Sequence, residues 1–214
     1  MPYPNPPWNL HGNGFQTLHL LDVDRVRPAI PAALNILTPL PGKTLGGIYL
    51  ATYGAGSTLQ YHELIVVSGV IYHAGKLGAW ISHIYVDLPD SVMGGREIWG
   101  LPKELAAFEW DVTETTAKVK VKQGDRTLCS LQTQPQPYTN FLGWRQPLWV
   151  AVFGQKPTEL LWFTGQTTVN WKLTNATLQI PTESPFSQLQ LGSPWLSFRL
   201  NDLTLIANPP KQIS

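Results

Sequence analysis

No long stretch of this chain has apolar residues that recur every 3.6 residues, which argues against a fold built mainly of helices. Its apolar segments are rich in β-branched and aromatic residues and are separated by glycine-containing breaks, as is typical of successive strands. They include LGGIYLATY, HELIVVSGVIY, AWISHIYVDL, PLWVAVFG and WLSFRLNDLTLIA. We therefore expect a mainly β (α+β) fold, in which a curled antiparallel sheet forms a cone- or barrel-like clam with a few short helices.

The composition does not change abruptly along the 214 residues, so a single domain over residues 1–214 is expected. The proline-rich residues 1–14 predict an extended arm on the surface or on a neighbouring subunit. A short helix with Asp24 near its cap is predicted within residues 24–34. Residues 108–132 predict a hairpin that turns at the Gln-Gly-Asp sequence, with Lys118, Lys120 and Lys122 on a solvated face and Cys129 packed as a small apolar residue.

Charge and cysteine content exclude several classes of function. The 15 basic and 14 acidic residues give a net charge of +1 and are scattered singly, so nucleic acid is not an expected partner. The single cysteine excludes an internal disulfide and fits a reducing compartment. The chain shows no signal peptide and no window long enough to span a membrane, so a cytoplasmic protein is expected. Charged residues make up only 14% of the chain, which favours a homo-oligomer or a lined cavity.

Metal and cofactor sites lack support in the sequence. The five histidines do not have the close, face-matched spacing of metal ligands, and in the Tyr-His-Glu sequence at 61–63 strand geometry points His62 and Glu63 to opposite faces. The glycines at 54–56 and 46–47 fit neither a phosphate loop nor a dinucleotide fingerprint. We expect neither a metal nor a cofactor.

The sequence GGREIWGLPKELAAF, residues 94–108, places Lys103 among Gly, Pro, Ile, Trp and Leu. A lysine amine becomes nucleophilic near neutral pH when burial disfavours its ammonium form. Trp99, Leu101 and Pro102 suit such a site, and Glu104 diverges from Lys103 in extended geometry. The alternative is an exposed lysine at a helix start with Pro102 in the first helical position, and the spacing alone favours this alternative. The 9 Trp, 7 Tyr and 7 Phe residues fit a large β core, and some of them could line an apolar pocket.

Three segments resemble the acetoacetate decarboxylase superfamily: Tyr-His-Glu at 61–63, His-Ile-Tyr-Val-Asp at 83–87, and GGREIWGLPKELA at 94–106. The resemblance implies that Lys103 is a Schiff-base lysine and Glu63 its pocket glutamate. It also implies a barrel of antiparallel strands with the lysine in an apolar interior, and an oligomer. Arg96 and Glu97 are expected to be structural or to shape the pocket, together with Trp99 and Tyr61.

The chain departs from the family pattern at two positions. The decarboxylases usually follow the catalytic lysine with a second lysine, and here Glu104 occupies that position. They also carry an arginine near the N-terminus that binds the substrate carboxylate, and the sequence LHGNGFQ offers none; Arg25 and Arg27 lie too far along the chain. These departures affect recognition of a β-keto acid more than Schiff-base formation.

The segments PWNLHGNGFQTLHLL, TLGGIYLATY and HELIVVSGV also resemble the plant neoxanthin-deficient proteins of the same superfamily. Two functions follow from the resemblances. The first is a lyase in which Lys103 attacks a small keto acid or ketone, leading to decarboxylation or to an aldol or dehydration step, with Glu63 assisting proton transfer. The second is a non-catalytic protein that binds a hydrophobic, isoprenoid- or carotenoid-related ligand in an apolar cavity. Retention of Lys103 favours the first.

Overall fold

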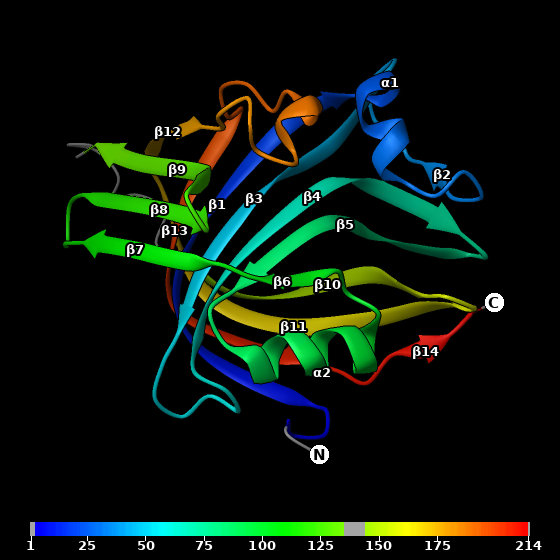
Figure 1. Ribbon diagram of the computed structural model, residues 1–214, viewed down its shortest axis with the longest axis horizontal. Helices are drawn as coiled ribbons and strands as arrows, with labels where there is room; N and C mark the ends of the chain where they lie inside the picture. Colours follow the sequence, from blue (N-terminus) through cyan, green and yellow to red (C-terminus); the bar gives the residue numbers. More distant parts are fainter. Residues whose placement is uncertain (1–2, 135–143, 214) are drawn as a thin grey trace.

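The structure is a computed structural model that describes residues 3–134 and 144–213. Within these residues, seven strands close into a barrel in the order β4, β3, β1, β13, β11, β10, β5 and back to β4 (Figure 1). The neighbours are antiparallel except β5 and β10, which pair in parallel over two residues only. The barrel strands are β1 (Trp8–Asp22), β3 (Lys43–Tyr53), β4 (Tyr61–His73), β5 (Lys76–Val86), β10 (Trp144–Lys156), β11 (Glu159–Leu173) and β13 (Leu196–Ala207).

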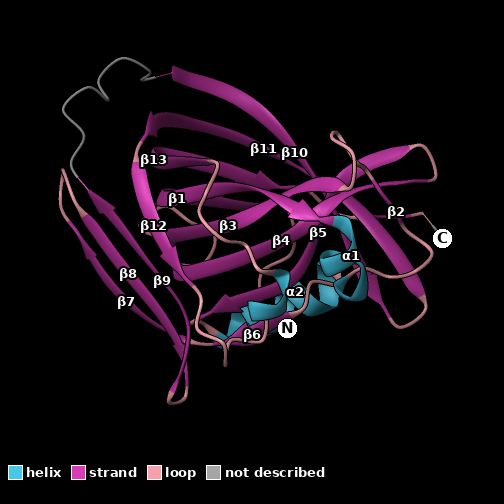
Figure 2. Cartoon of the chain, turned by 90° about the horizontal axis from the view of Figure 1, so that it is seen from above, coloured by secondary structure: helices cyan, strands magenta, loops and turns pink. Residues whose placement is uncertain are grey.

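A second, four-stranded sheet lies against one side of the barrel (Figure 2). Its strands, in spatial order, are β12 (Asn175–Gln179), β9 (Arg126–Gln134), β8 (Ala117–Gln123) and β7 (Ala107–Val112). The remaining elements are short: α1 (Val23–Val26), η1 (Arg27–Ala29), β2 (Asn35–Ile36), α2 (Pro89–Trp99), β6 (Lys103–Leu105), η3 (Ser187–Leu189) and β14 (Lys211–Gln212). None of the described helices has the length and apolarity that crossing a membrane requires.

Strand β4 is buried on both of its faces, as the near-continuous apolarity of its sequence predicts. Leu64 and Val66 pack into the core beneath the second sheet, together with Val119 and Val121 of β8. The alternate residues of β4 face the barrel interior, because successive side chains of a strand point to opposite sides. This alternation places Glu63 inside the barrel.

Helix α2 begins at Pro89, whose fixed φ suits a first helical position. It ends at Gly100, which adopts the left-handed conformation with φ 65° and donates its N–H to the Arg96 carbonyl oxygen. The Leu101 N–H bonds the Gly95 carbonyl oxygen, which completes the cap. The chain then leaves the helix directly into β6, which starts at Lys103 and pairs in parallel with β5.

The structure differs from the sequence expectations at three places. Trp8–Gly14 is not an extended arm but the first half of β1, between β3 and β13. Residues 107–134 form a three-stranded meander, in which the expected hairpin is β8 and β9. The sheet is mixed, because β5 pairs in parallel with both β10 and β6. The short helix near residues 24–34 is confirmed as α1 and η1, although Asp24 is inside α1 and does not cap it.

We predict that the protein loses stability in mild acid through His19. This buried imidazole contacts the Leu191 carbonyl oxygen at 2.8 Å and Thr17 Oγ1 at 3.0 Å, and burial lowers its pKa below the ordinary value of 6.5. The unfolded chain therefore takes up a proton at a pH where folded His19 still resists it, so its contribution is present above about pH 6.5 and is lost as the pH falls further. Urea unfolding between pH 7.5 and 5 should give a shallower pH dependence for His19→Gln than for the wild type. Equal slopes would contradict the prediction.

Candidate active site

The interior of the barrel contains a cavity of about 260 Å³. Its walls are mostly apolar and come from all seven barrel strands, from α2 and from the segment that leads into β6. Among the described residues that line it, the charged side chains are those of Lys103 and Glu63.

Lys103 and Glu63 form a buried ion pair although 40 residues separate them. Lys103 Nζ lies 2.8 Å from Glu63 Oε1 and 3.0 Å from Ser91 Oγ, and the two residues are only 3% and 4% exposed. Four elements bring the groups together: β6 carries the lysine and pairs with β5, β5 pairs with β4 so that Glu63 faces inward, and α2 supplies Ser91. Charges so deeply buried are stable only when they are paired and hydrogen-bonded.

A chain of tyrosine hydroxyls continues from the carboxylate. Tyr53 donates to Glu63 Oε2 at 3.1 Å, and the Tyr49 hydroxyl lies 3.0 Å from that of Tyr53. Because Tyr53 has a single hydroxyl proton and gives it to Glu63, Tyr49 must be the donor in the second bond. Burial raises the pKa of both tyrosines well above 10, so both remain protonated donors. Tyr49 also lines the cavity, so the chain links the cavity to the back of the Glu63 carboxylate.

Two aromatic faces surround the lysine head group. Lys103 Nζ lies 5.0 Å from the ring centroid of Tyr61 and 5.8 Å from that of Trp8. Aromatic faces attract cations, more strongly where water is excluded. The same faces would stabilise a positive charge that remains on this nitrogen after it is alkylated.

The residues of the Gly-Gly-Arg-Glu sequence hold the lysine in place without lining the cavity. A Cβ atom on Gly95 would lie 2.4 Å from Lys103 Cδ, so only glycine lets the lysine stem cross the helix here. A Cβ on Gly94 would likewise meet the Trp8 ring at 2.6 Å. Arg96 Nε donates to the Lys103 carbonyl oxygen at 2.7 Å, and Glu97 accepts a hydrogen bond from the Tyr3 hydroxyl.

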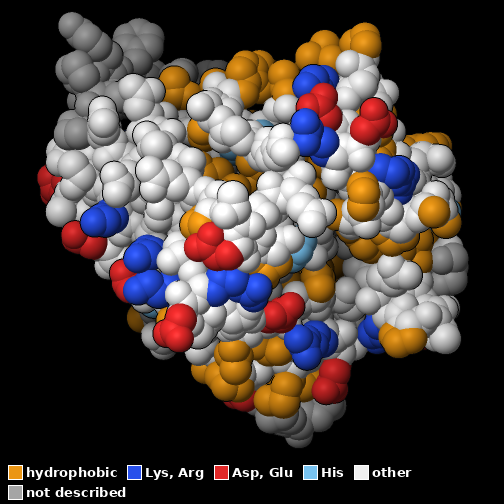
Figure 3. Space-filling model, turned by 45° about the horizontal axis from the view of Figure 1, so that its top comes forward, with side chains coloured by type: hydrophobic (Ala, Val, Ile, Leu, Met, Phe, Trp, Pro, Cys, Tyr) orange, Lys and Arg blue, Asp and Glu red, His pale blue; other side chains and the backbone are white. Residues whose placement is uncertain are grey.

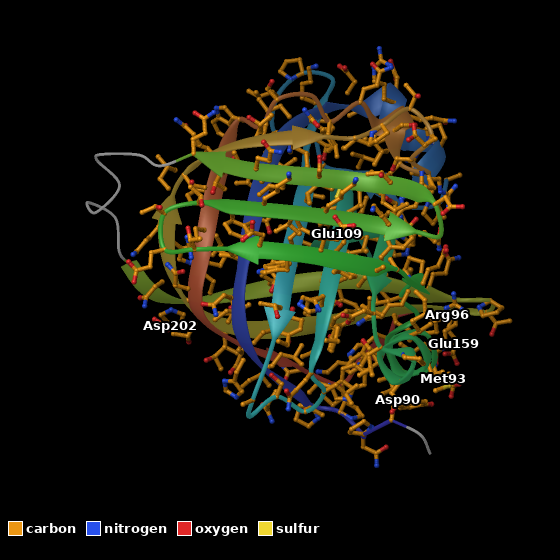
Figure 4. All side chains as sticks on the ribbon, turned by 60° about the vertical axis from the view of Figure 1, so that its left-hand side comes forward. Asp90, Met93, Arg96, Glu109, Glu159 and Asp202 are labelled. Atoms are coloured by element: carbon orange, nitrogen blue, oxygen red, sulfur yellow. The ribbon has the colours of Figure 1, made fainter. Side chains whose placement is uncertain are left out.

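The structure brings together four of the six residues named from the sequence. Lys103, Glu63, Trp99 and Tyr61 line the cavity, whereas Arg96 and Glu97 are exposed on α2. Figure 4 shows Arg96 on this helix. The alternative of an exposed lysine at a helix start is wrong, because the helix precedes Lys103 and the lysine lies in β6. Its neighbour Glu104 points away from the cavity and accepts a hydrogen bond from Gln123 Nε2 at 2.7 Å.

Sequence reasoning missed Ser91, Tyr49 and Tyr53. The tyrosines had a usable signal: they are four residues apart in a predicted strand, and an even spacing puts them on one face. Ser91 and Gly95 are four residues apart on α2, which also puts them on one face, but the helix itself was not predicted.

Charged side chains are mixed in sign on the one face of the molecule that Figure 3 draws. On that face, acidic and basic side chains are interspersed and form no large patch of one sign. His62, next to Glu63 in sequence, points outward and pairs with Asp87 at 2.6 Å. The part of the chain that the structure describes has no group of three or more His, Cys, Asp or Glu side chains placed to hold a metal ion.

The buried pair should dominate a mutational test of stability. Lys103→Met leaves Glu63 buried without its cation, and we expect a loss of about 3–5 kcal/mol in the free energy of unfolding. The double variant Lys103→Met/Glu63→Gln should lose less than the two single variants together. The control is Lys122→Met, which breaks the exposed pair of Lys122 with Glu109 (2.6 Å) and should change the free energy of unfolding far less, because water screens an exposed pair. Similar losses for Lys103→Met and Lys122→Met in urea unfolding would disprove the special role of the buried pair.

Comparison with known proteins agrees with this geometry. Residues 1–146 match the family model described as acetoacetate decarboxylase (ADC). The protein NEOXANTHIN-DEFICIENT 1 of Solanum lycopersicum is 30% identical over 120 residues, a match that covers 56% of this chain and 40% of the tomato protein. The chain thus spans less than half the length of that relative.

Solved structures show the same fold. The acetoacetate decarboxylase of Legionella pneumophila superposes with a TM-score of 0.78 at 18% identity, over 100% of this chain and 90% of its own. The enduracididine biosynthesis enzyme MppR, in a structure complexed with pyruvate, gives a TM-score of 0.73 at 15% identity over 99% and 92% of the two chains. On the family match, the chain belongs to the acetoacetate decarboxylase family.

Proposed function

We propose that Lys103 is a Schiff-base nucleophile and that the protein is a lyase acting on a small keto acid or ketone. The observation that carries the proposal is the position of Lys103 Nζ, buried in the lining of an apolar cavity and 2.8 Å from a carboxylate that can take its proton. Membership of a decarboxylase family and the fold shared with MppR, whose structure holds pyruvate, support it.

The first step is a proton transfer within the buried pair. In this step Glu63 takes a proton from Lys103 along the hydrogen bond between Nζ and Oε1, which leaves a neutral amine beside a neutral carboxylic acid. Glu104, at the position of the second lysine of the decarboxylases, points away from the cavity, so the activating factor available to Lys103 is its burial.

The neutral amine then attacks the carbonyl carbon of the substrate. A C–N bond forms, and the carbonyl oxygen receives one proton from the amine and one from Glu63 and leaves as water. The nitrogen keeps its other proton and becomes a positively charged iminium beside the Glu63 carboxylate. The rings of Tyr61 and Trp8 face this charge. In a decarboxylation, the electrons of the bond to the carboxylate move into the iminium as CO₂ leaves. The resulting enamine takes up a proton at carbon, and water releases the ketone and Lys103.

Borohydride trapping tests this proposal directly. Incubation with acetone, acetoacetate or pyruvate under borohydride should give a reduced adduct in the intact mass, which peptide mapping should place on Lys103. Lys103→Met should abolish the adduct, whereas Lys122→Met, at an exposed lysine, should retain it. An adduct that persists in Lys103→Met, or no adduct with any of the carbonyl compounds on folded wild-type protein, would overturn the proposal.

The tyrosine chain should affect the rate of iminium formation. Tyr53→Phe removes the donor to Glu63 Oε2, so the carboxyl group loses its fixed position beside Lys103. We expect the maximal trapping rate to fall about tenfold, the equivalent of one strong hydrogen bond, at an unchanged half-saturating ketone concentration. Tyr72→Phe, on the exposed part of β4, is the matched control and should trap at the wild-type rate. A wild-type rate for Tyr53→Phe would contradict the role of the chain.

A second candidate function is non-catalytic binding of a hydrophobic ligand, including one of isoprenoid or carotenoid type. The almost entirely apolar wall and the similarity to the neoxanthin-deficient protein favour it. The cavity lies just below the usual range of roughly 300–1,000 Å³ for small-molecule sites, so it would hold one end of a long polyene. This function predicts that such ligands quench tryptophan fluorescence equally in the wild type and in Lys103→Met. Absence of quenching would rule out this second function.

A further inference from the structure

Two buried polar groups in the cavity wall have no hydrogen-bond partner among the described residues. They are Thr167 Oγ1 and Trp171 Nε1, both on β11. A buried donor or acceptor left without a partner costs about 1–3 kcal/mol, so nearly all such groups in native proteins are satisfied. The two other unpartnered groups, Ser68 Oγ and Ser184 Oγ, do not line the cavity. Because Thr167 and Trp171 both line the cavity, a ligand in the cavity is the candidate partner for these two groups.

The position of these donors relative to Lys103 follows from the barrel order. In the closed ring, β11 is three strands away from β4 through β5 and β10, so it forms the wall opposite Glu63. Thr167 and Trp171 face inward because β11 pairs regularly with β10 and its alternate residues line the cavity. The surface around Thr167 is apolar, formed by Gly165 and Val169 on its own strand.

The chemistry of the two groups defines what they bind. The indole N–H only donates, and the threonine hydroxyl donates as well as accepts, so together they suit an oxygen acceptor. Among the described lining residues, Lys103 is the single cation, and it is already paired with Glu63. A carboxylate in this part of the cavity would be desolvated without a counter-ion, whereas a hydroxyl, ether or carbonyl oxygen would not carry that cost.

We propose that the site takes an uncharged carbonyl compound with an apolar body and a second, neutral oxygen. The carbonyl group lies at Lys103, and the second oxygen binds the Thr167 hydroxyl, with the Trp171 N–H as a further donor on the same wall. The placement of the carbonyl group at Lys103 rests on the proposed Schiff-base function. The placement of the second oxygen at Thr167 does not rest on it, because it follows from the unpartnered groups on β11.

Borohydride trapping with matched ketones tests the proposal. A series of straight-chain methyl ketones from butanone to decan-2-one is compared with the same ketones that carry a terminal hydroxyl. A hydroxyl that enters an apolar cavity without a partner weakens binding. At the chain length that reaches Thr167, the wild type should instead reach half-maximal trapping at roughly tenfold lower concentration of the hydroxy ketone than of the plain ketone.

Matched variants on β11 assign this preference to Thr167. Thr167→Val keeps the shape of the side chain and removes the hydroxyl, so the difference in half-maximal trapping concentration between each hydroxy ketone and its plain ketone should disappear. Thr168→Val, at the next residue with its side chain on the opposite face of the strand, should keep the preference. A preference that survives in Thr167→Val, or none at any chain length in the wild type, would overturn the proposal. Stronger trapping of a keto acid than of the hydroxy ketone of equal length would overturn the uncharged substrate class.

A non-carbonyl probe separates failure of this proposal from failure of the Schiff-base function. Straight-chain alcohols of the same lengths are titrated into Lys103→Met and followed by tryptophan fluorescence. If no ketone is trapped but alcohols bind and Thr167→Val weakens them roughly tenfold, the Schiff-base function fails and the Thr167 site stands. If ketones are trapped but alcohols bind equally with and without the Thr167 hydroxyl, the Schiff-base function stands and the Thr167 site fails.

Discussion

Burying the amine of Lys103 beside the carboxyl group of Glu63 is the most demanding feature of this fold. Each charged group that leaves water loses several kcal/mol of hydration, and only good geometry with further hydrogen bonds offsets the loss. The structure supplies both, because Ser91 bonds the amine and Tyr53 bonds the carboxylate. The rest of the barrel can be understood as what holds these groups together in a dry interior.

The Gly-Gly-Arg-Glu sequence shows how a motif can serve a reactive residue without touching a ligand. The two glycines let α2 approach the Trp8 ring and the lysine stem, and Arg96 fixes the backbone of β6 through the Lys103 carbonyl oxygen. A mutation on the outer side of α2 can therefore shift the position of the Lys103 amine inside the barrel. Proximity in sequence to Lys103 is not evidence that a side chain enters the cavity.

Sequence patterns predicted the strands well, and the reason is physical. The near-continuous apolar sequence of β4 predicts burial on both faces of this strand, and the structure confirms it. The same pattern says that His62 and Glu63 point to opposite faces but not which of them faces the interior, so the pocket position of Glu63 was expected only from the family resemblance. Helix α2 could not be predicted from its sequence, because its buried face consists of Ser91, Gly94, Gly95 and Trp99 rather than an apolar stripe. The pairing of Lys103 with Glu63 required a resemblance to a known family, since no local rule relates residues 40 positions apart.

The strands of the barrel differ in what lies behind them: β4 is covered by the second sheet, whereas β10 and β11 face solvent. Side chains of β4 pack on the second sheet behind it, so a change of backbone position there would disturb two cores at once. The wall made by β10 and β11 has solvent behind it, as the exposed Trp149 and Gln166 show, and β10 is joined to β5 by two residue pairs only. A substitution on the outer face of β10 or β11 therefore meets solvent, whereas one on the outer face of β4 meets a second packed sheet beside the Lys103–Glu63 pair.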